Sequence, residues 1–154
     1  MFIRRRDLSQ ALQMFNTAGP EQFTKMICTF APYFSTIQPQ LTALRPGYAE
    51  AEVPFRREIT NHIGSVHAIA LCNAAELVGG VMTDVSVPAG ARWLPTGMTV
   101  QYLAKAETDV KAVADGSGLN WTTPGEKVVP VEAFDADGSK VFTARITMNV
   151  KLAA

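Results

Sequence analysis

A single carboxylate stands in the most apolar segment of the chain. Between Val66 and Met82 the only formally charged residue is Glu76, and its neighbours at helical spacing include Cys72 and Gly80. A carboxylate in apolar surroundings costs free energy unless it is paired, hydrogen-bonded or protonated. Such perturbed carboxylates are candidate general bases or nucleophiles. Glu76 is therefore the first candidate for catalysis; the alternative is that the helix turns it toward solvent or toward a structural arginine.

A polar turn precedes this apolar segment, where residues 61–68 read NHIGSVHA. Unpaired backbone N–H groups at the start of a helix can stabilise an oxyanion, and Gly64 would let a substrate approach the backbone closely. Asn61 could orient a water molecule or polarise a carbonyl group. In the alternative interpretation, Ser65 only caps the helix and Gly64 only makes the turn.

Two other arrangements of these residues are disfavoured. A nucleophilic pair of Ser65 and His67 is unfavourable because residues two apart on a helix do not face each other. A metal site built from His62, His67 and Glu76 does not suit the five-residue spacing of the histidines, so no metal is expected.

The elements that must position these residues follow from periodicity. Apolar residues at helical spacing predict two opening helices and a long central one, and alternation predicts a hairpin and then four strands. The expected helices are 7–16, 21–34 and 65–82; the hairpin runs from 37 to 57, and the strands are 92–106, 108–114, 127–134 and 140–152. Pro130 removes a ladder hydrogen bond and predicts an edge or a bulge at that point.

Composition limits the classes of function. The 154 residues are 47% hydrophobic and 18% charged, with 14 basic and 14 acidic side chains, which excludes global disorder and disfavours binding to nucleic acid. So little charge also favours association between copies of the chain. Cys28 and Cys72 match no disulfide framework or zinc module.

Targeting signals are also missing from the sequence pattern. The basic amino terminus leads into an amphipathic stretch rather than a secretory apolar core, so we expect a cytoplasmic protein. The apolar segment 65–82 contains His67, Asn73 and Glu76, which favours a buried helix of a soluble protein over a membrane span, and no membrane partner is expected.

A helix that is apolar nearly all round has to be enclosed. A curved antiparallel sheet of about five or six strands wrapped around it does so, which predicts an α+β fold and leaves a sheet edge for a second copy. We expect a single domain over residues 1–154, with residues 1–36 as a helical extension and 37–152 as the core.

The motif Asn61-x-x-Gly64-x-x-His67-Ala68, with Glu76 nine positions after the histidine, resembles the hotdog-fold acyl-CoA thioesterases of the phenylacetic-acid-degradation type. These proteins typically show Asn-x-x-Gly-x-x-His-Gly-Gly and then an Asp or Glu at about this distance. The resemblance covers residues 37–152 in element order and makes 65–82 the enclosed helix. Where the family has two glycines, this chain has Ala68-Ile69, which keeps a backbone donor but narrows the approach of the acyl group.

The resemblance implies a role for each residue of the motif. Glu76 would be the general base or nucleophile, Asn61 would position water or substrate, and the backbone N–H of Ala68 would polarise the thioester carbonyl. Gly64, Ser65 and His67 would belong to the turn that positions the substrate. The site would lie across the interface of a homodimer or a dimer of dimers, with the coenzyme A thioester as substrate and no further cofactor.

Two other functions remain open at this point. The same groove could hold an acyl-CoA or a fatty acyl chain without turnover, or the protein could be a hotdog hydratase or dehydratase, although the proline-rich turn usual around the dehydratase histidine is missing. Arg56, Arg57, Arg92 and Lys105 could meet the phosphates of coenzyme A or could be solvated surface charges.

Overall fold

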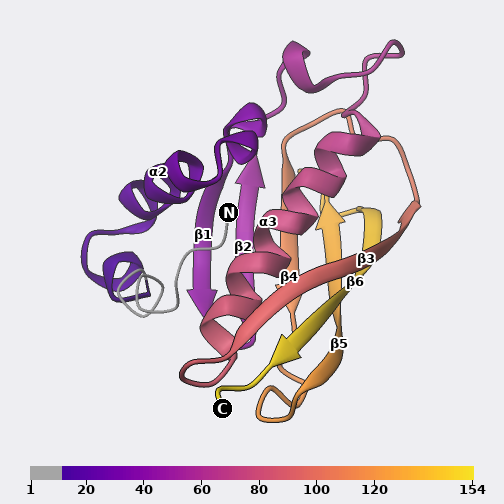
Figure 1. The fold of residues 1–154 in the computed structure, drawn as a ribbon. Helices are drawn as coiled ribbons and strands as arrows, with labels where there is room; N and C mark the ends of the chain where they lie inside the picture. Colours follow the sequence, from indigo (N-terminus) through magenta and orange to yellow (C-terminus); the bar gives the residue numbers. More distant parts are fainter. Residues whose placement is uncertain (1–11) are drawn as a thin grey trace.

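The computed structural model describes residues 12–154, and its main element is one antiparallel sheet. The order of the strands across the sheet is β1-β2-β4-β5-β6-β3. Figure 1 shows these strands curving around a long helix. The strands are β1 (Gln40–Arg45), β2 (Tyr48–Val53), β3 (Arg92–Tyr102), β4 (Val110–Asp115), β5 (Gly125–Phe134) and β6 (Lys140–Lys151).

The long helix, α3 (Ala68–Ser86), lies across the concave face of the sheet (Figure 1). It is long and apolar enough to span a membrane, but 61% of that apolar window is buried inside the protein, so it is the core helix of the fold. Alanines on β2 and β4 let it approach closely, since Ala49 and Ala114 are completely buried. The predicted α+β hotdog arrangement, a curved sheet around one apolar helix with helices before it, is confirmed.

Prolines explain two differences between the predicted and observed boundaries. The predicted helix 21–34 is split into α2 (Pro20–Phe30) and the 3-10 helix η1 (Pro32–Ile37), because Pro32 cannot continue the hydrogen-bond ladder of α2. The second strand of the predicted hairpin 37–57 ends at Val53, directly before Pro54. Residues 12–16 of the first predicted helix are helical, as is Thr17, and residues 7–11 of it lie outside the described part of the chain.

Pro130 lies where one neighbour of β5 ends. The pairing of β4 with β5 stops at Ala114 opposite Val131, whereas β6 continues past Pro130, which lies opposite Arg145. Before Val131, β5 therefore has a partner on one side only, so the proline removes no ladder bond to β4. This edge-like setting is the one that the proline predicted.

The two edges of the sheet differ in cover. Helix α2 packs against β1 at one edge, where the backbone N–H of Leu41 donates to Thr24 Oγ1 at 3.1 Å. Thr24 is buried, and its hydroxyl donates in turn to the carbonyl oxygen of Pro20. The β3 edge has no such cover among residues 12–154, and Leu94 and Met98 on this strand are exposed. An uncovered edge strand is a template for pairing with another chain.

The bond between α2 and β1 leads to a test of stability. We expect Thr24→Val to lower the free energy of unfolding by about 1–2 kcal/mol, because the buried N–H of Leu41 loses its acceptor. Thr29→Val is the matched control, since exposed Thr29 makes the same bond to the carbonyl four residues earlier but none to a strand. Urea denaturation of both variants measures the difference, and equal losses would contradict the proposed anchor.

Candidate functional site

Asn61 organises the turn that leads into α3. Its Oδ1 accepts from the backbone N–H groups of Ile63 and Ser65, both at 3.1 Å, and its Nδ2 donates to Ser65 Oγ at 2.9 Å. Gly64 has a φ of +81°, a conformation that costs other residues about 1 kcal/mol or more. The amide of Asn61 is thus used within the turn, and Gly64 is needed for its backbone angle.

The turn is also tied to the neighbouring backbone. His67 N–H donates to the carbonyl of Ile59, and Val66 N–H donates to the carbonyl of Ala106, both at 2.7 Å. These bonds delay the start of the helix from the predicted residue 65 to Ala68. The segment that precedes the helix is therefore held in place from two sides.

His67 caps α3, and Ser65 does not. The His67 Nδ1 atom accepts from the backbone N–H of Ile69 at 3.0 Å, whereas Ser65 bonds to Asn61. Ser65 and His67 therefore do not face each other as a nucleophile and its base. The backbone N–H of Ala68, at the first position of the helix, has no acceptor among residues 12–154. It is a free donor at the positive end of the helix dipole.

Glu76 is half-buried on α3, two turns after Ala68. Burial raises the pKa of its carboxyl above the ordinary value near 4.5. Within the described part of the chain, no side chain forms a hydrogen bond or an ion pair with it. The alternative of a structural arginine partner therefore finds no support, and Glu76 retains the features of a reactive base.

The β3 strand borders the side of α3 that carries Glu76. Near one end, the Trp93 ring lies beside Gly80, and its Nε1 donates to Asp84 Oδ1 at 2.6 Å. Near the other, the hydroxyl of Tyr102 lies 3.6 Å from Cys72 Sγ. The exposed apolar side chains on α3 and this strand include Ile69 at 52%, Tyr102 at 52% and Met98 at 36%.

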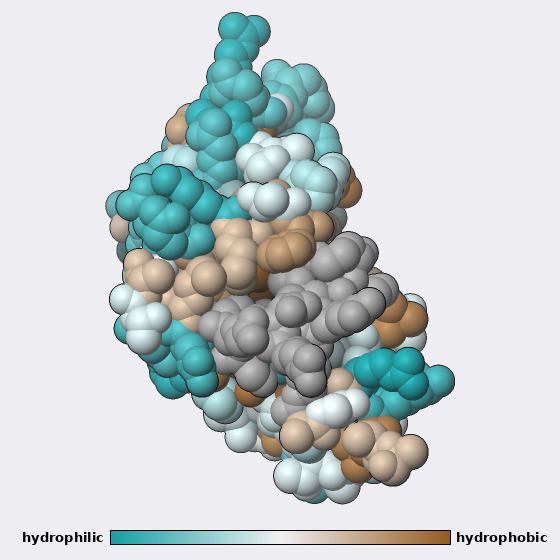
Figure 2. All heavy atoms as spheres, turned by 60° about the vertical axis from the view of Figure 1, so that its left-hand side comes forward, coloured by the Kyte–Doolittle hydropathy of each residue, from teal (hydrophilic) through white to brown (hydrophobic). Residues whose placement is uncertain are grey.

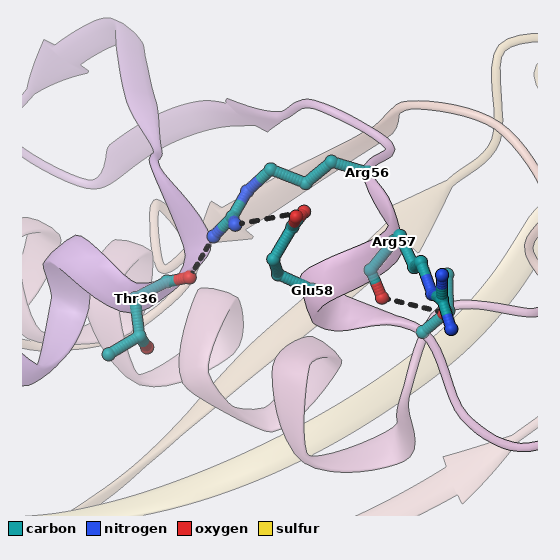
Figure 3. A network of polar contacts seen from close by, with 5 residues as sticks. Thr36, Arg56, Arg57 and Glu58 are labelled. Atoms are coloured by element: carbon teal, nitrogen blue, oxygen red, sulfur yellow. Dashed lines mark hydrogen bonds and ion pairs between the residues drawn. The ribbon is translucent and has the colours of Figure 1, made fainter.

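A separate polar network fixes the segment between β2 and α3, which includes the 3-10 helix η2 (Arg57–Ile59). Arg56 donates to the carbonyl of Thr36 and pairs with Glu58, while the Arg57 side chain extends away from this pair (Figure 3). Arg56 is thus engaged in structural contacts, which weakens its case as a phosphate ligand. The segment between β2 and α3 lies at the top of the view in Figure 2, where the surface is hydrophilic, and apolar residues are gathered below it.

Asn73 links α3 to the same network. Its Nδ2 donates to Thr36 Oγ1 at 3.2 Å and lies 3.4 Å from the carbonyl oxygen of Tyr33. The amide is buried on the side of α3 that faces η1. Asn73 therefore fixes the rotation of the helix that carries Glu76. Among residues 12–154, no three His, Cys, Asp or Glu side chains are grouped so that they could hold a metal ion.

The sequence reasoning missed two residues of this region. From the sequence, Asn73 was noted only as a polar residue that disfavours a membrane span, and its contact with η1 depends on the break at Pro32. Tyr102 alternates in register with Val100 and Met98, so the strand pattern places it on the inner face of β3. No pattern in the sequence indicates that its hydroxyl reaches Cys72.

Comparison with known proteins adds a family and a fold. The family model described as "Domain of unknown function (DUF4442)" matches residues 19–150. No curated protein matches the chain.

The solved structures that are similar to the chain include the following three. A crystal structure from structural genomics is 61% identical, with a TM-score of 0.87, and the match covers 95% of this chain and 99% of that one. A thioesterase from Haemophilus influenzae is 16% identical, with a TM-score of 0.74 and coverage of 84% and 89%. A probable thioesterase from Pseudomonas aeruginosa is 22% identical, with a TM-score of 0.70 and coverage of 78% and 87%. The last two likenesses show the hotdog fold.

The environment of Glu76 predicts a pH-dependent cost to stability. Burial raises the pKa of Glu76 in the folded state. At pH values above its unfolded pKa near 4.5, the ionised carboxylate therefore destabilises the protein, and this destabilisation disappears as the pH falls and the carboxylate protonates. We expect Glu76→Gln to raise the Tm at pH 8 and to lose this advantage toward pH 4. Exposed Glu52 is the control, since Glu52→Gln removes a charge without relieving burial. A lower Tm for Glu76→Gln at pH 8 would show that the carboxylate has a stabilising partner.

Proposed function

Since the chain belongs to the DUF4442 family, whose description assigns no activity, we propose a function from its site: hydrolysis of an acyl-CoA thioester to a free acid and coenzyme A. The observation that carries the proposal is Glu76, a half-buried carboxylate without a partner among the described residues, on a helix whose first N–H is a free donor. The motif shared with the phenylacetic-acid-degradation type and the thioesterase fold support the same reaction.

The spacing of the two groups calls for a second copy of the chain. Ala68 and Glu76 are eight residues apart on one helix, which separates them by about 12 Å along its axis. A glutamate side chain leans toward the helix N-terminus but covers less than about half of this distance. Glu76 and the Ala68 N–H of one chain therefore do not reach the same carbonyl group, whereas those of two antiparallel helices do.

The uncovered edge of the sheet supplies the place for that copy. We propose that β3 pairs with β3 of a second chain about a twofold axis, which sets the two α3 helices side by side and covers Met98 and Leu94. Each dimer then has two equal sites, each with Glu76 from one chain and the Ala68 N–H from the other. A homodimer or a dimer of such dimers satisfies this arrangement.

The proposed reaction uses these groups in order. The Glu76 carboxylate takes a proton from a water molecule, and the water oxygen attacks the thioester carbonyl carbon. The N–H of Ala68 from the other chain stabilises the oxyanion. The carbon–sulfur bond then breaks, and the coenzyme A thiolate leaves with the proton that Glu76 holds. Asn61, Gly64, Ser65 and His67 act by holding Ala68 in place, and the chain needs no further cofactor.

One observation favours binding without turnover as a second candidate. Ile69 projects from α3 directly after Ala68 and is 52% exposed, where the family motif has a glycine. Its side chain narrows the approach to the Ala68 N–H. Tight binding of acyl-CoAs with no release of free thiol would select this candidate over the enzyme.

Replacement of Glu76 tests the general base. We expect Glu76→Gln and Glu76→Ala to lower kcat about 100-fold or more, the usual contribution of a general base. Free thiol release should be measured over short, long and aromatic acyl-CoAs, with Glu52→Gln as the control. Because the pKa of Glu76 is raised, activity of the unmodified protein should fall as the pH drops through a value above 4.5. Equal rates for the unmodified protein and Glu76→Ala on every active substrate would remove Glu76 from the mechanism.

Removal of a single N–H tests the oxyanion donor. Ala68 is the first residue of α3, a position that accepts proline, and His67 before it already has the extended conformation that proline requires. Ala68→Pro therefore deletes the donor and keeps the helix. We expect a loss of about 100-fold or more in kcat with little change in Tm.

Mixing the two variants tests the shared site. A heterodimer of Glu76→Gln and Ala68→Pro chains contains one intact site, so unfolding and refolding an equal mixture should restore about a quarter of the original activity. Light scattering on each sample reports whether dimers form. If the mixture stays inactive while dimers form, Glu76 and Ala68 do not meet across the interface.

A further inference from the structure

Tyr102 ends β3 beside the proposed site and presents its hydroxyl to α3. Its ring contacts that of Phe142, with 6.0 Å between the ring centroids, and the two residues are directly paired across β3 and β6. Phe142 is completely buried, so this contact holds the Tyr102 ring against the core. The side chain is nevertheless 52% exposed and can be reached by a ligand on the open side of α3.

The present partner of the hydroxyl is a weak one. It lies 3.6 Å from Cys72 Sγ, and a thiol is a poor acceptor and a poor donor compared with a carbonyl oxygen. A phenol hydroxyl next to a thiol therefore exchanges that contact for a carbonyl oxygen at little cost. Within residues 12–154 it has no other hydrogen-bond partner.

Helix geometry places this hydroxyl close to Glu76. Cys72 and Glu76 are four residues apart on α3, so they share one face, with about 6 Å between their Cβ atoms. The hydroxyl of Tyr102 therefore lies within about one helical turn of the carboxylate. A carbonyl group bound beside Glu76 would therefore lie within reach of the hydroxyl.

The surroundings keep the hydroxyl protonated. The bond to Cys72 and partial burial raise the pKa of Tyr102 above its ordinary value near 10. Among the described residues, no charged side chain pairs with the hydroxyl, whose partner is Cys72. Tyr102 thus offers a neutral donor at pH values up to about 10.

We propose that the Tyr102 hydroxyl donates a hydrogen bond to the carbonyl oxygen of the thioester bound beside Glu76, as a second donor in addition to the Ala68 N–H. The inference deepens the proposed function and rests on it for the identity of the substrate. Tyr102 would then contact the reacting group directly. Its hydrogen bond to the carbonyl oxygen would become stronger as negative charge develops on that oxygen.

Two unreactive ligands isolate this contact from turnover. In the ketone analogue of an acyl-CoA, a methylene replaces the sulfur and the carbonyl is kept; in the alkyl-CoA thioether, the sulfur is kept and the carbonyl is lost. Tyr102→Phe should weaken binding of the ketone about 3- to 10-fold, the usual value of one hydrogen bond, and leave binding of the thioether within about twofold. With an active thioester, its kcat should fall about 10- to 100-fold with a smaller change in KM.

Tyr48→Phe is the matched control. Tyr48 lies on the outer face of β2, where its hydroxyl donates to Glu50 at 2.9 Å, so loss of this hydroxyl should change neither binding nor kcat. Cys72→Ala separates direct from indirect action. If Cys72→Ala weakens binding of the ketone as much as Tyr102→Phe does, the tyrosine acts through the thiol and the proposal is overturned.

The outcomes distinguish the two proposals. Unchanged ketone binding and kcat in Tyr102→Phe, with activity lost in Glu76→Gln, would overturn the role of Tyr102 and keep thioester hydrolysis. Loss of ketone binding in Tyr102→Phe, in a protein that hydrolyses no thioester, would support the contact and overturn the enzyme. Failure of the unmodified protein to bind either ligand would overturn both. Light scattering of Tyr102→Phe confirms that its assembly is unchanged.

Discussion

The α3 helix is apolar or small around nearly its whole circumference, and the free energy of removing that surface from water governs the fold. A flat sheet would cover only one side of such a helix, so the sheet has to curve around it. Buried alanines on β2 and β4 bring the helix close to the strands, as does Gly79, where an added Cβ would lie 2.9 Å from Ile146 Cδ1. The remaining side of the helix faces the β3 edge.

The features of chemical interest gather on that remaining side. A carboxylate without a partner costs stability wherever it is shielded from water, and the core would tolerate an apolar residue at position 76 better. The carboxylate at position 76, beside an open sheet edge, lowers stability and provides a reactive group. Cover by a second copy would remove more water from Glu76 and strengthen every hydrogen bond made there. The proposed dimer would thus complete the core and the site with the same contact.

Much of the fold follows from the sequence because its long elements have a clear period. The alternation in 140–152 defines β6 to within one residue, and the run around Glu76 defines the core helix. Boundaries were less accurate where long-range bonds decide them. The helix starts at Ala68 because the backbone of Val66 and His67 is bound to Ala106 and Ile59, which no local pattern indicates.

The candidate site was predicted in the same uneven way. Glu76 was conspicuous because charge is scarce around it, and the turn before α3 was recognised from its residue types. The function of the Asn61 side chain within the turn was not apparent, because an amide that orients water and one that holds a backbone have the same sequence signature. Tyr102 was missed since its position depends on the register between β3 and β6.

The unequal edges of the sheet have a consequence for solubility at high concentration. If both outer strands were open, each chain could add another at either end, and the sheet could grow into a fibre without limit. The hydroxyl of Thr24 occupies a backbone donor of β1, and α2 stands against that strand. Addition of a further chain is thereby blocked at the β1 edge. Pairing through the β3 edge therefore ends with two chains, because no open edge strand is left for a third.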